Sequence, residues 1–133
     1  MEVQKFNFWQ DHSRQYLEMA FRFDRRKTIN NPDGYGKKTG SCGDTVEMFL
    51  IVRNDRIESV FYEIDGCRNT NACANTVAEL SEGKTVDEAW EIMPDDVIDY
   101  LKTLPKENYH CAELSMGAFY LALASLQKKK TNT

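Results

Sequence analysis

Three of the four cysteines in this 133-residue chain occupy positions from which a fold could gather their thiols into one site. Cys42 lies in a glycine-rich stretch, Cys67 ends a β-like run, and Cys111 opens a long apolar stretch. Because they are far apart in the sequence, they do not form the close Cys-x-x-Cys pairs of a zinc ribbon. Asp44 and His110 stand beside two of them and add oxygen and nitrogen donors. This donor set suits an iron–sulfur or zinc centre with one weakly bound position.

The surroundings of each thiol favour its availability as a thiolate. Cys67 and Cys111 are each expected at the N-terminus of a helix, where the helix dipole stabilises a negative charge. Cys42 lies between Gly40 and Gly43, which permit unusual backbone angles and close approach, so we expect it on a movable loop. We therefore expect all three thiols to be ligands.

The fourth ligand is left open between Asp44 and His110. A carboxylate is a hard ligand that binds a thiophilic iron cluster weakly, so Asp44 would provide a corner that is easily released. His110 could take the same position, or act as a base that keeps Cys111 deprotonated.

Cys73 and His12 are predicted to lie outside the site. Cys73 shares one helical face with Val77 and Leu80, so we expect it to point into the core as a small apolar residue. His12 is expected to be an ordinary surface side chain on the first helix.

The elements that must position these residues follow from the periodicity of the sequence. Two alternating runs, 45–52 and 57–64, flank Asn54-Asp55 and predict an antiparallel hairpin, while residues 30–36 are dense in turn formers. Helices are predicted over 8–27, 71–81, 85–92, 94–101 and 111–127, followed by a frayed, solvated tail over 128–133. This order predicts an α+β fold, with a small antiparallel sheet of about three strands and helices packed on one face.

Length and composition indicate a single domain over residues 1–133. The chain is 41% hydrophobic and 29% charged, as in a soluble globular protein, and no apolar run is long enough to span a bilayer. Its net charge of −4 gives a nucleic acid no electrostatic support. No secretory signal is visible, so we expect a cytoplasmic protein with reduced cysteines and with neither a membrane nor a nucleic-acid partner.

Three short stretches resemble the ligand motifs of the IscU/NifU N-terminal-type iron–sulfur cluster assembly scaffold proteins. They are Gly40-Ser41-Cys42-Gly43-Asp44, Asp65-Gly66-Cys67 and His110-Cys111, and a strand pair and a helical region separate them in this order. The resemblance runs from about Asn31 to Leu126.

The resemblance implies a scaffold and carrier protein, not a turnover enzyme. Its cargo would be iron and a transient [2Fe–2S] cluster, held by Cys42, Cys67, Cys111 and Asp44, with His110 as the alternative ligand. A cysteine desulfurase of the IscS/NifS type would deliver persulfide sulfur to Cys111, assisted by His110. The finished cluster would then pass to recipient apo iron–sulfur proteins.

The resemblance leaves two partnerships undetermined. Typical members carry Leu-Pro-Pro-Val-Lys before His-Cys as a chaperone recognition segment, whereas this chain has Leu104-Pro105-Lys106-Glu107-Asn108. A dedicated chaperone is therefore doubtful. A homodimer is left open.

Two other functions would use the same residues. A zinc-binding sulfur acceptor would hold Zn²⁺ with the same thiols, and the sequence does not separate it from the scaffold. A Cys–His hydrolase would use Cys111 as its nucleophile, but the directly adjacent His110 makes the geometry of a general base awkward.

Overall fold

The computed structural model describes residues 12–131 of the chain, with side chains through residue 126. A three-stranded antiparallel sheet is combined with helices, which confirms the predicted α+β class. The elements, in chain order, are α2 (Arg14–Phe21), β1 (Gly34–Thr39), β2 (Thr45–Arg53), β3 (Arg56–Asp65), α3 (Arg68–Ser81), α4 (Val86–Ala89), α5 (Pro94–Leu101), a short 3₁₀ helix (Lys106–Asn108) and α6 (Tyr109–Thr131).

The sheet is built around the hairpin of β2 and β3, which the sequence predicted. Asn54 and Asp55 connect the strands, and both have positive φ angles, 54° and 63°. Two consecutive left-handed residues are what a tight two-residue hairpin turn of type I′ requires, and Asn and Asp tolerate this conformation well. The strand order is β1-β2-β3, so β2 is the central strand.

The third strand, β1, lies partly where the sequence predicted a turn. Residues 34–39 pair antiparallel with β2, from Gly34 opposite Leu50 to Thr39 opposite Thr45. The glycines that suggested a turn serve a different purpose, because α6 presses directly on this strand. A Cβ atom placed on Gly36 would lie 2.2 Å from the carbonyl oxygen of Ala118, so no side chain fits there.

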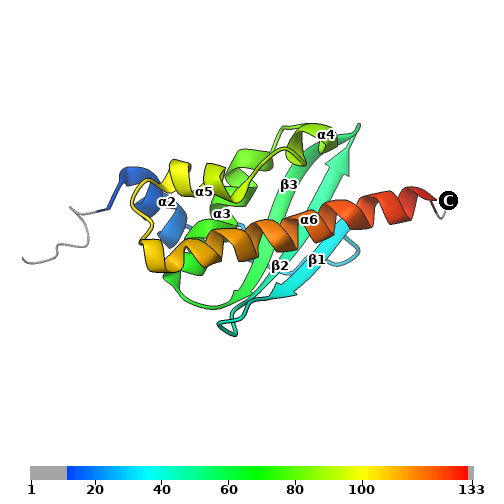
Figure 1. Cartoon of the computed structure of the whole chain (residues 1–133). Coiled ribbons are helices and arrows are strands. Elements are labelled where there is room, and N and C mark those ends of the chain that lie inside the picture. Colours follow the sequence, from blue (N-terminus) through cyan, green and yellow to red (C-terminus); the bar gives the residue numbers. More distant parts are fainter. Residues whose placement is uncertain (1–11, 132–133) are drawn as a thin grey trace, which may run out of the picture.

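The helices cover one face of the sheet, as predicted. Figure 1 shows α6 running along the sheet in front of β1 and β2. Val46, Met48 and Leu50 alternate along β2, and all three are fully buried in the core that α3 and α6 share. Phe49 points to the opposite face, where its ring lies 5.3 Å from that of Tyr35 on the neighbouring strand.

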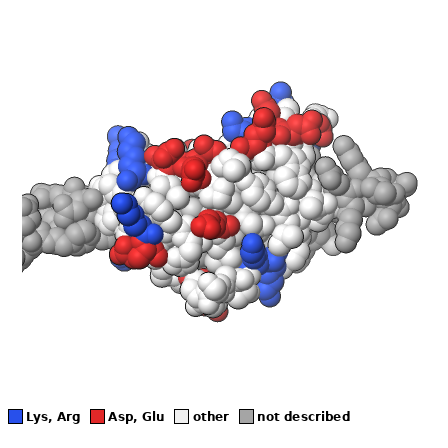
Figure 2. Space-filling model, viewed as in Figure 1, with Lys and Arg blue, Asp and Glu red and all other residues white. Residues whose placement is uncertain are grey.

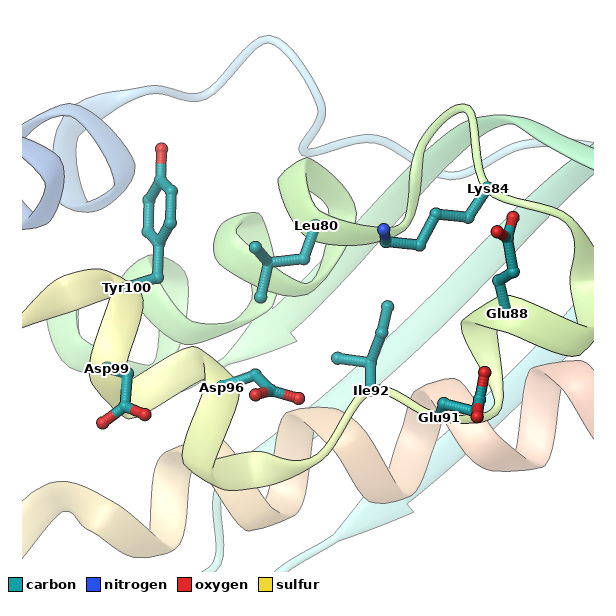
Figure 3. Close-up of a pocket in the computed structure, with 8 residues that line it drawn as sticks. All are labelled: Leu80, Lys84, Glu88, Glu91, Ile92, Asp96, Asp99 and Tyr100. Atoms are coloured by element: carbon teal, nitrogen blue, oxygen red, sulfur yellow. The ribbon is translucent and has the colours of Figure 1, made fainter.

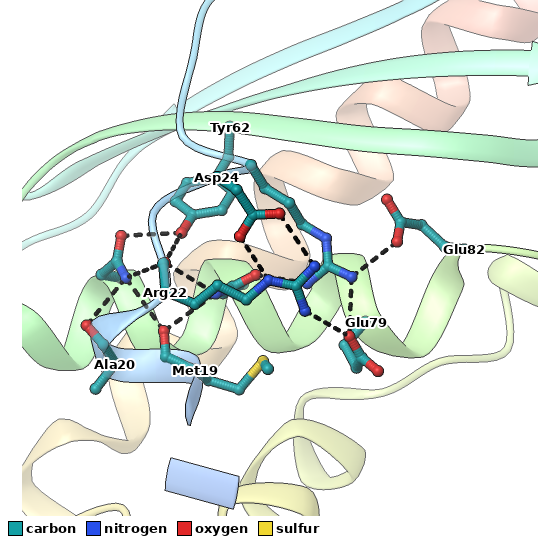
Figure 4. Close-up of polar contacts among 10 residues, drawn as sticks. Met19, Ala20, Arg22, Asp24, Tyr62, Glu79 and Glu82 are labelled. Atoms are coloured by element: carbon teal, nitrogen blue, oxygen red, sulfur yellow. Dashed lines mark hydrogen bonds and ion pairs between the residues drawn. The ribbon is translucent and has the colours of Figure 1, made fainter. Parts of the chain in front are cut away.

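The first helix is shorter than predicted. Of the predicted range 8–27, residues 8–11 lie outside the described part, and α2 ends at Phe21. The side-chain amides of Asn71 and Asn75 on α3 donate hydrogen bonds of 3.1–3.3 Å to backbone carbonyls at the end of α2 (Figure 4). These carbonyls belong to Met19, Ala20 and Arg22. These side-chain amides thus take the place of the backbone N–H groups that a further helical turn would have donated to the same carbonyls.

Arg25 lies within the predicted helical range 8–27, but it follows the observed end of α2 and turns inward. Its guanidinium donates to Asn75 Oδ1 at 2.7 Å, to Glu79 Oε1 at 2.8 Å and to Glu82 Oε1 at 2.8 Å. We call these four residues the Arg25 cluster. The cluster fixes the segment after α2 against α3, and the other oxygen of Glu82 accepts from the backbone N–H of Val60 in β3.

The remaining helices agree with the prediction to different degrees. The bounds of α5 are as predicted, with Pro94 in its first turn, whereas α4 covers only four residues of the predicted 85–92. The backbone of α6 continues as helix through Thr131, beyond the predicted end at Gln127, and lysine is a good helix former. The last two residues of the predicted tail, 132 and 133, lie outside the described part. Among the described helices, none combines the length and apolar character needed to cross a bilayer.

Candidate functional site

Two of the three candidate cysteines begin helices, as predicted. Cys67 is the N-cap residue of α3, with its side chain exposed, and Cys111 lies in the first turn of α6, with its side chain buried. Cys42 lies in the connection between β1 and β2, where it is exposed. That connection is a tight turn in which the Gly43 N–H donates to the Gly40 carbonyl at 3.0 Å. All four cysteines are free thiols.

The hydroxyl of Thr70 joins three of the predicted site residues. Thr70 lies in the first turn of α3, and its Oγ1 donates to Asp44 Oδ2 at 3.0 Å. The same oxygen lies 3.7 Å from the sulfur of Cys67 and 3.8 Å from the sulfur of Cys111. We call Asp44, Cys67, Thr70 and Cys111 the thiol cluster. Residues from the β1–β2 connection, α3 and α6 meet in it.

Sequence reasoning missed Thr70. The available signal was its position three residues after Cys67, which is the N3 position of a helix that begins at Arg68. A Ser or Thr at N3 can turn its hydroxyl back to the N-cap residue, and the Cys67 N–H does lie 3.3 Å from Thr70 Oγ1. The sequence analysis places a helix start just after Cys67 and a helix over 71–81, but it assigns Thr70 no role in the site.

His110 and Cys42 lie at the margin of the thiol cluster. His110 is exposed, and its Nε2 lies 3.7 Å from the Cys111 sulfur. A hollow of about 170 Å³ is lined by Gly40 and Ser41 on one side and by His110 on the other. It therefore adjoins the turn that carries Cys42. In the described part of the chain, no three His, Cys, Asp or Glu residues converge closely enough to hold an ion in this conformation.

The two thiols of the cluster differ in acidity. Burial pushes the pKa of Cys67 upward, but the backbone N–H and hydroxyl of Thr70 and the backbone N–H of Asn69 outweigh it, so the pKa is lowered. Burial raises the pKa of Cys111, and the nearby charges of Cys67 and Asp44 raise it further. The expectation that Cys111 carries an enlarged thiolate fraction is therefore wrong for this conformation, because desolvation outweighs its helix position. Its buried sulfur also offers no exposed nucleophile for the hydrolase alternative.

Cys73 and His12 had been predicted to lie outside the site. Cys73 is fully buried in the core, as predicted, and this burial raises its pKa well above the ordinary value. His12 is not an ordinary surface side chain. Its Nδ1 lies 3.0 Å from Thr103 Oγ1, and its ring stacks on Tyr16 with centroids 4.0 Å apart.

A larger hollow, of about 620 Å³, lies between the end of α3 and the helices α4 and α5 (Figure 3). Its lining contains no thiol and combines Glu88, Glu91, Asp96 and Asp99 with Leu80, Lys84, Ile92 and Tyr100. Glu88 and Asp96 accept from the backbone N–H groups of Thr85 and Met93, so they serve as helix caps. Acidic side chains gather over α4 and α5 along this edge of the molecule (Figure 2). This hollow therefore offers none of the sulfur ligands that the thiol cluster provides.

The sequence of this chain is similar to one family of domains and to proteins with related names. Residues 27–133 match the family model of the NifU-like N-terminal domain. The iron–sulfur cluster assembly scaffold protein IscU 1 of Archaeoglobus fulgidus is 32% identical over 102 residues, covering 76% of this chain and 67% of that protein. The scaffold protein IscU of Escherichia coli is 27% identical over 116 residues, covering 81% and 90%.

A solved structure shows the same fold. The N-terminal part of a NifU-like protein from Brucella abortus superposes with a TM-score of 0.69 at 18% identity, covering 88% of this chain and 94% of that one. The sheet and the arrangement of helices are thus those of a known fold.

Proposed function

Because the chain belongs to the family of NifU-like N-terminal domains, we propose that it is a scaffold on which an iron–sulfur cluster is assembled and from which the cluster is passed to apo-proteins. We propose a [2Fe–2S] cluster as the cargo, with sulfur supplied by a cysteine desulfurase. The role is that of a carrier, which returns to its starting state after each transfer and converts no small molecule by itself.

The observation that carries this proposal is the meeting of Asp44, Cys67 and Cys111 around the Thr70 hydroxyl. Thiolates are the ligands that iron–sulfur clusters prefer, and a carboxylate is a poorer match for them. The cluster residues come from three different elements, so small shifts of these elements can tighten or open the site. A carrier needs such a site, because it must release what it binds.

We propose that Cys42 completes the thiol set by a movement of the 40–43 turn. Cys42 is exposed, and its neighbours Gly40 and Ser41 line the hollow that His110 also lines. Gly43 adopts a positive φ of 92°, a conformation that glycine adopts without strain. A thiol on an exposed turn can reach a bound cluster and can also leave it. Asp44 or His110 would then supply the remaining ligand.

We further propose Cys111 as the persulfide acceptor, with His110 beside it. Because the Cys111 sulfur is buried, docking of the desulfurase would have to expose it first. Mass spectrometry of trapped peptides tests this choice, and persulfide that accumulates first on Cys67 would refute it. The cytoplasmic location predicted from the sequence stays a prediction, and it fits the free thiols.

Anaerobic reconstitution with ferric iron and sulfide tests the proposed function. We expect visible charge-transfer absorption with two iron atoms per cluster, and we expect its loss when Cys42, Cys67 or Cys111 is replaced by Ser. Cys73→Ser is the matched control, because this thiol lies in the core. A colourless protein that binds only zinc would favour the sulfur-acceptor alternative instead.

The role of Asp44 separates a transient scaffold from a permanent holder. If its carboxylate is the labile corner, Asp44→Ala should lengthen the lifetime of an assembled cluster and slow its transfer to an apo-ferredoxin. An ordinary structural ligand behaves oppositely, because its loss weakens the site. Absorbance under anaerobic conditions measures both rates. Faster decay in Asp44→Ala than in the unmodified protein would refute this role.

A further inference from the structure

Thr70 lies at the centre of the thiol cluster although its own side chain is an unsuitable ligand for a soft metal. A hydroxyl carries one proton and two lone pairs. The proton goes to Asp44 Oδ2, because a carboxylate is an acceptor only, and the oxygen stands 3.7–3.8 Å from two sulfurs. Thr70 is fully buried, so water does not substitute for these contacts.

The hydrogen bond determines how the Asp44 carboxylate is presented. Asp44 lies at the start of β2, in a connection that has no other anchor to α3 among the described side-chain contacts. With Oδ2 engaged by Thr70, the carboxylate is tied to the hydroxyl that also lies 3.7–3.8 Å from both sulfurs, and Oδ1 is left as the oxygen available to a metal. Carboxylates and imidazoles that bind metals commonly depend on such hydrogen-bonding partners.

We propose that Thr70 is a positioning residue that aims the Asp44 carboxylate at the metal held by Cys67 and Cys111. This inference rests on the proposed function, since it concerns the same site. It assigns Thr70 a role through Asp44, not a bond to the metal. It also explains why a polar side chain occupies a fully buried position between two thiols.

The backbone at Gly66 supports the close fit of this arrangement. A Cβ atom placed on Gly66 would lie 2.7 Å from Thr70 Oγ1 and 3.0 Å from Asp44 Oδ2. Any side chain at this position would therefore push the hydroxyl and the carboxylate aside, although every donor would still be present. Gly66→Ala is thus a second way to disturb the hydrogen bond between Thr70 and Asp44, and it changes neither of these two residues.

The test measures Zn²⁺ affinity of the metal-free protein by competition with a chromogenic chelator. Zn²⁺ serves as the probe because it accepts both thiolate and carboxylate ligands. Thr70→Val keeps the shape of the side chain and removes the hydroxyl, so we expect an affinity loss of about 10-fold. Thr70→Ser keeps the hydroxyl and should stay within about 2-fold of the unmodified protein. Gly66→Ala should resemble Thr70→Val.

The decisive comparison is made in an Asp44→Asn background. If Thr70 acts through the Asp44 carboxylate, adding Thr70→Val to Asp44→Asn should cause almost no further loss of affinity. Additive losses, or a Thr70→Val protein that binds Zn²⁺ as tightly as the unmodified one, would overturn the inference. If Thr70→Val does not fold, as judged by circular dichroism, Thr70→Ala takes its place in the same comparison.

Failure of the inference and failure of the proposed function give different results. An unmodified protein that binds neither Zn²⁺ nor an iron–sulfur cluster would contradict the proposed function. An unmodified protein that binds both, with an unchanged affinity in Thr70→Val, would contradict only the positioning role of Thr70.

Discussion

Replacing Arg25 by Ala should destabilise the protein strongly, although Arg25 is far from any thiol in the sequence. The side chain is only 8% exposed, and it makes three charge-assisted or polar hydrogen bonds of 2.7–2.8 Å. The change leaves Asn75 Oδ1 and Glu82 Oε1 without this donor, while Glu79 keeps a longer contact to Arg22 at 3.5 Å. The end of α2 would lose its attachment to α3.

The expected cost follows from the exposure of the partners. Removing one member of a buried ion pair typically costs about 3–5 kcal/mol, because a charge is left buried and unpaired. Glu79 and Glu82 are 37% and 27% exposed, so water can partly solvate them once Arg25 is gone. We therefore expect a value at the lower end of that range, about 3 kcal/mol.

Urea unfolding followed by circular dichroism measures this cost. With an m-value of about 2 kcal/mol per M, the midpoint should fall by about 1.5 M. Arg22→Ala is the matched control, because Arg22 and its partner Asp24 are 42% and 61% exposed, and it should cost about 0.5 kcal/mol. Equal midpoints for Arg25→Ala and Arg22→Ala would refute the assignment of Arg25 as a buried attachment point.

Two further predictions concern thiol reactivity and pH. In the metal-free protein, iodoacetamide should label the exposed Cys42 and Cys67 first, Cys111 slowly and Cys73 only after unfolding. Peptide mass spectrometry measures this order, and early labelling of Cys73 would contradict its burial. Burial raises the pKa of Tyr62 from 10.0 to about 12, so this tyrosine loses its proton at a lower pH in the unfolded chain than in the folded one. Its contribution to the free energy of unfolding should therefore be constant below pH 10 and fall between pH 10 and 12. Tyr62→Phe should make that fall shallower in urea titrations, and an unchanged slope would contradict the prediction.

Local patterns in the sequence predicted those elements whose structure depends on neighbours along the chain. The β2–β3 hairpin followed from alternation and from Asn54-Asp55, whose backbone tolerance is a local property. Cys73 was correctly placed in the core by its helical spacing. The helix start after Cys67 also followed from local signals, to within a few residues.

The features that were missed depend on contacts between distant segments. The end of α2 is set by amides of Asn71 and Asn75, which no local pattern around Phe21 reveals. Residues 34–36, at the start of β1, fall in the predicted turn, because nothing local shows that their glycines are needed for close approach of the α6 backbone. The acidity of Cys111 was misjudged for the same reason, since burial by the assembled fold opposes the effect of its helix position. Thr70 acquires its place between two sulfurs only when α3 and α6 come together.

The contact between Gly36 and Ala118 has a consequence for the order of events during synthesis. These residues are far apart in the sequence, so their contact is one of the long-range contacts whose loop closure slows folding. A ribosome that adds about 5–20 residues per second completes β1 several seconds before α6. Within that interval Cys42 and then Cys67 are synthesised before Cys111 and before the helix that supports the outer strand. Loading of the cargo is therefore expected to be a post-translational step that acts on the finished fold.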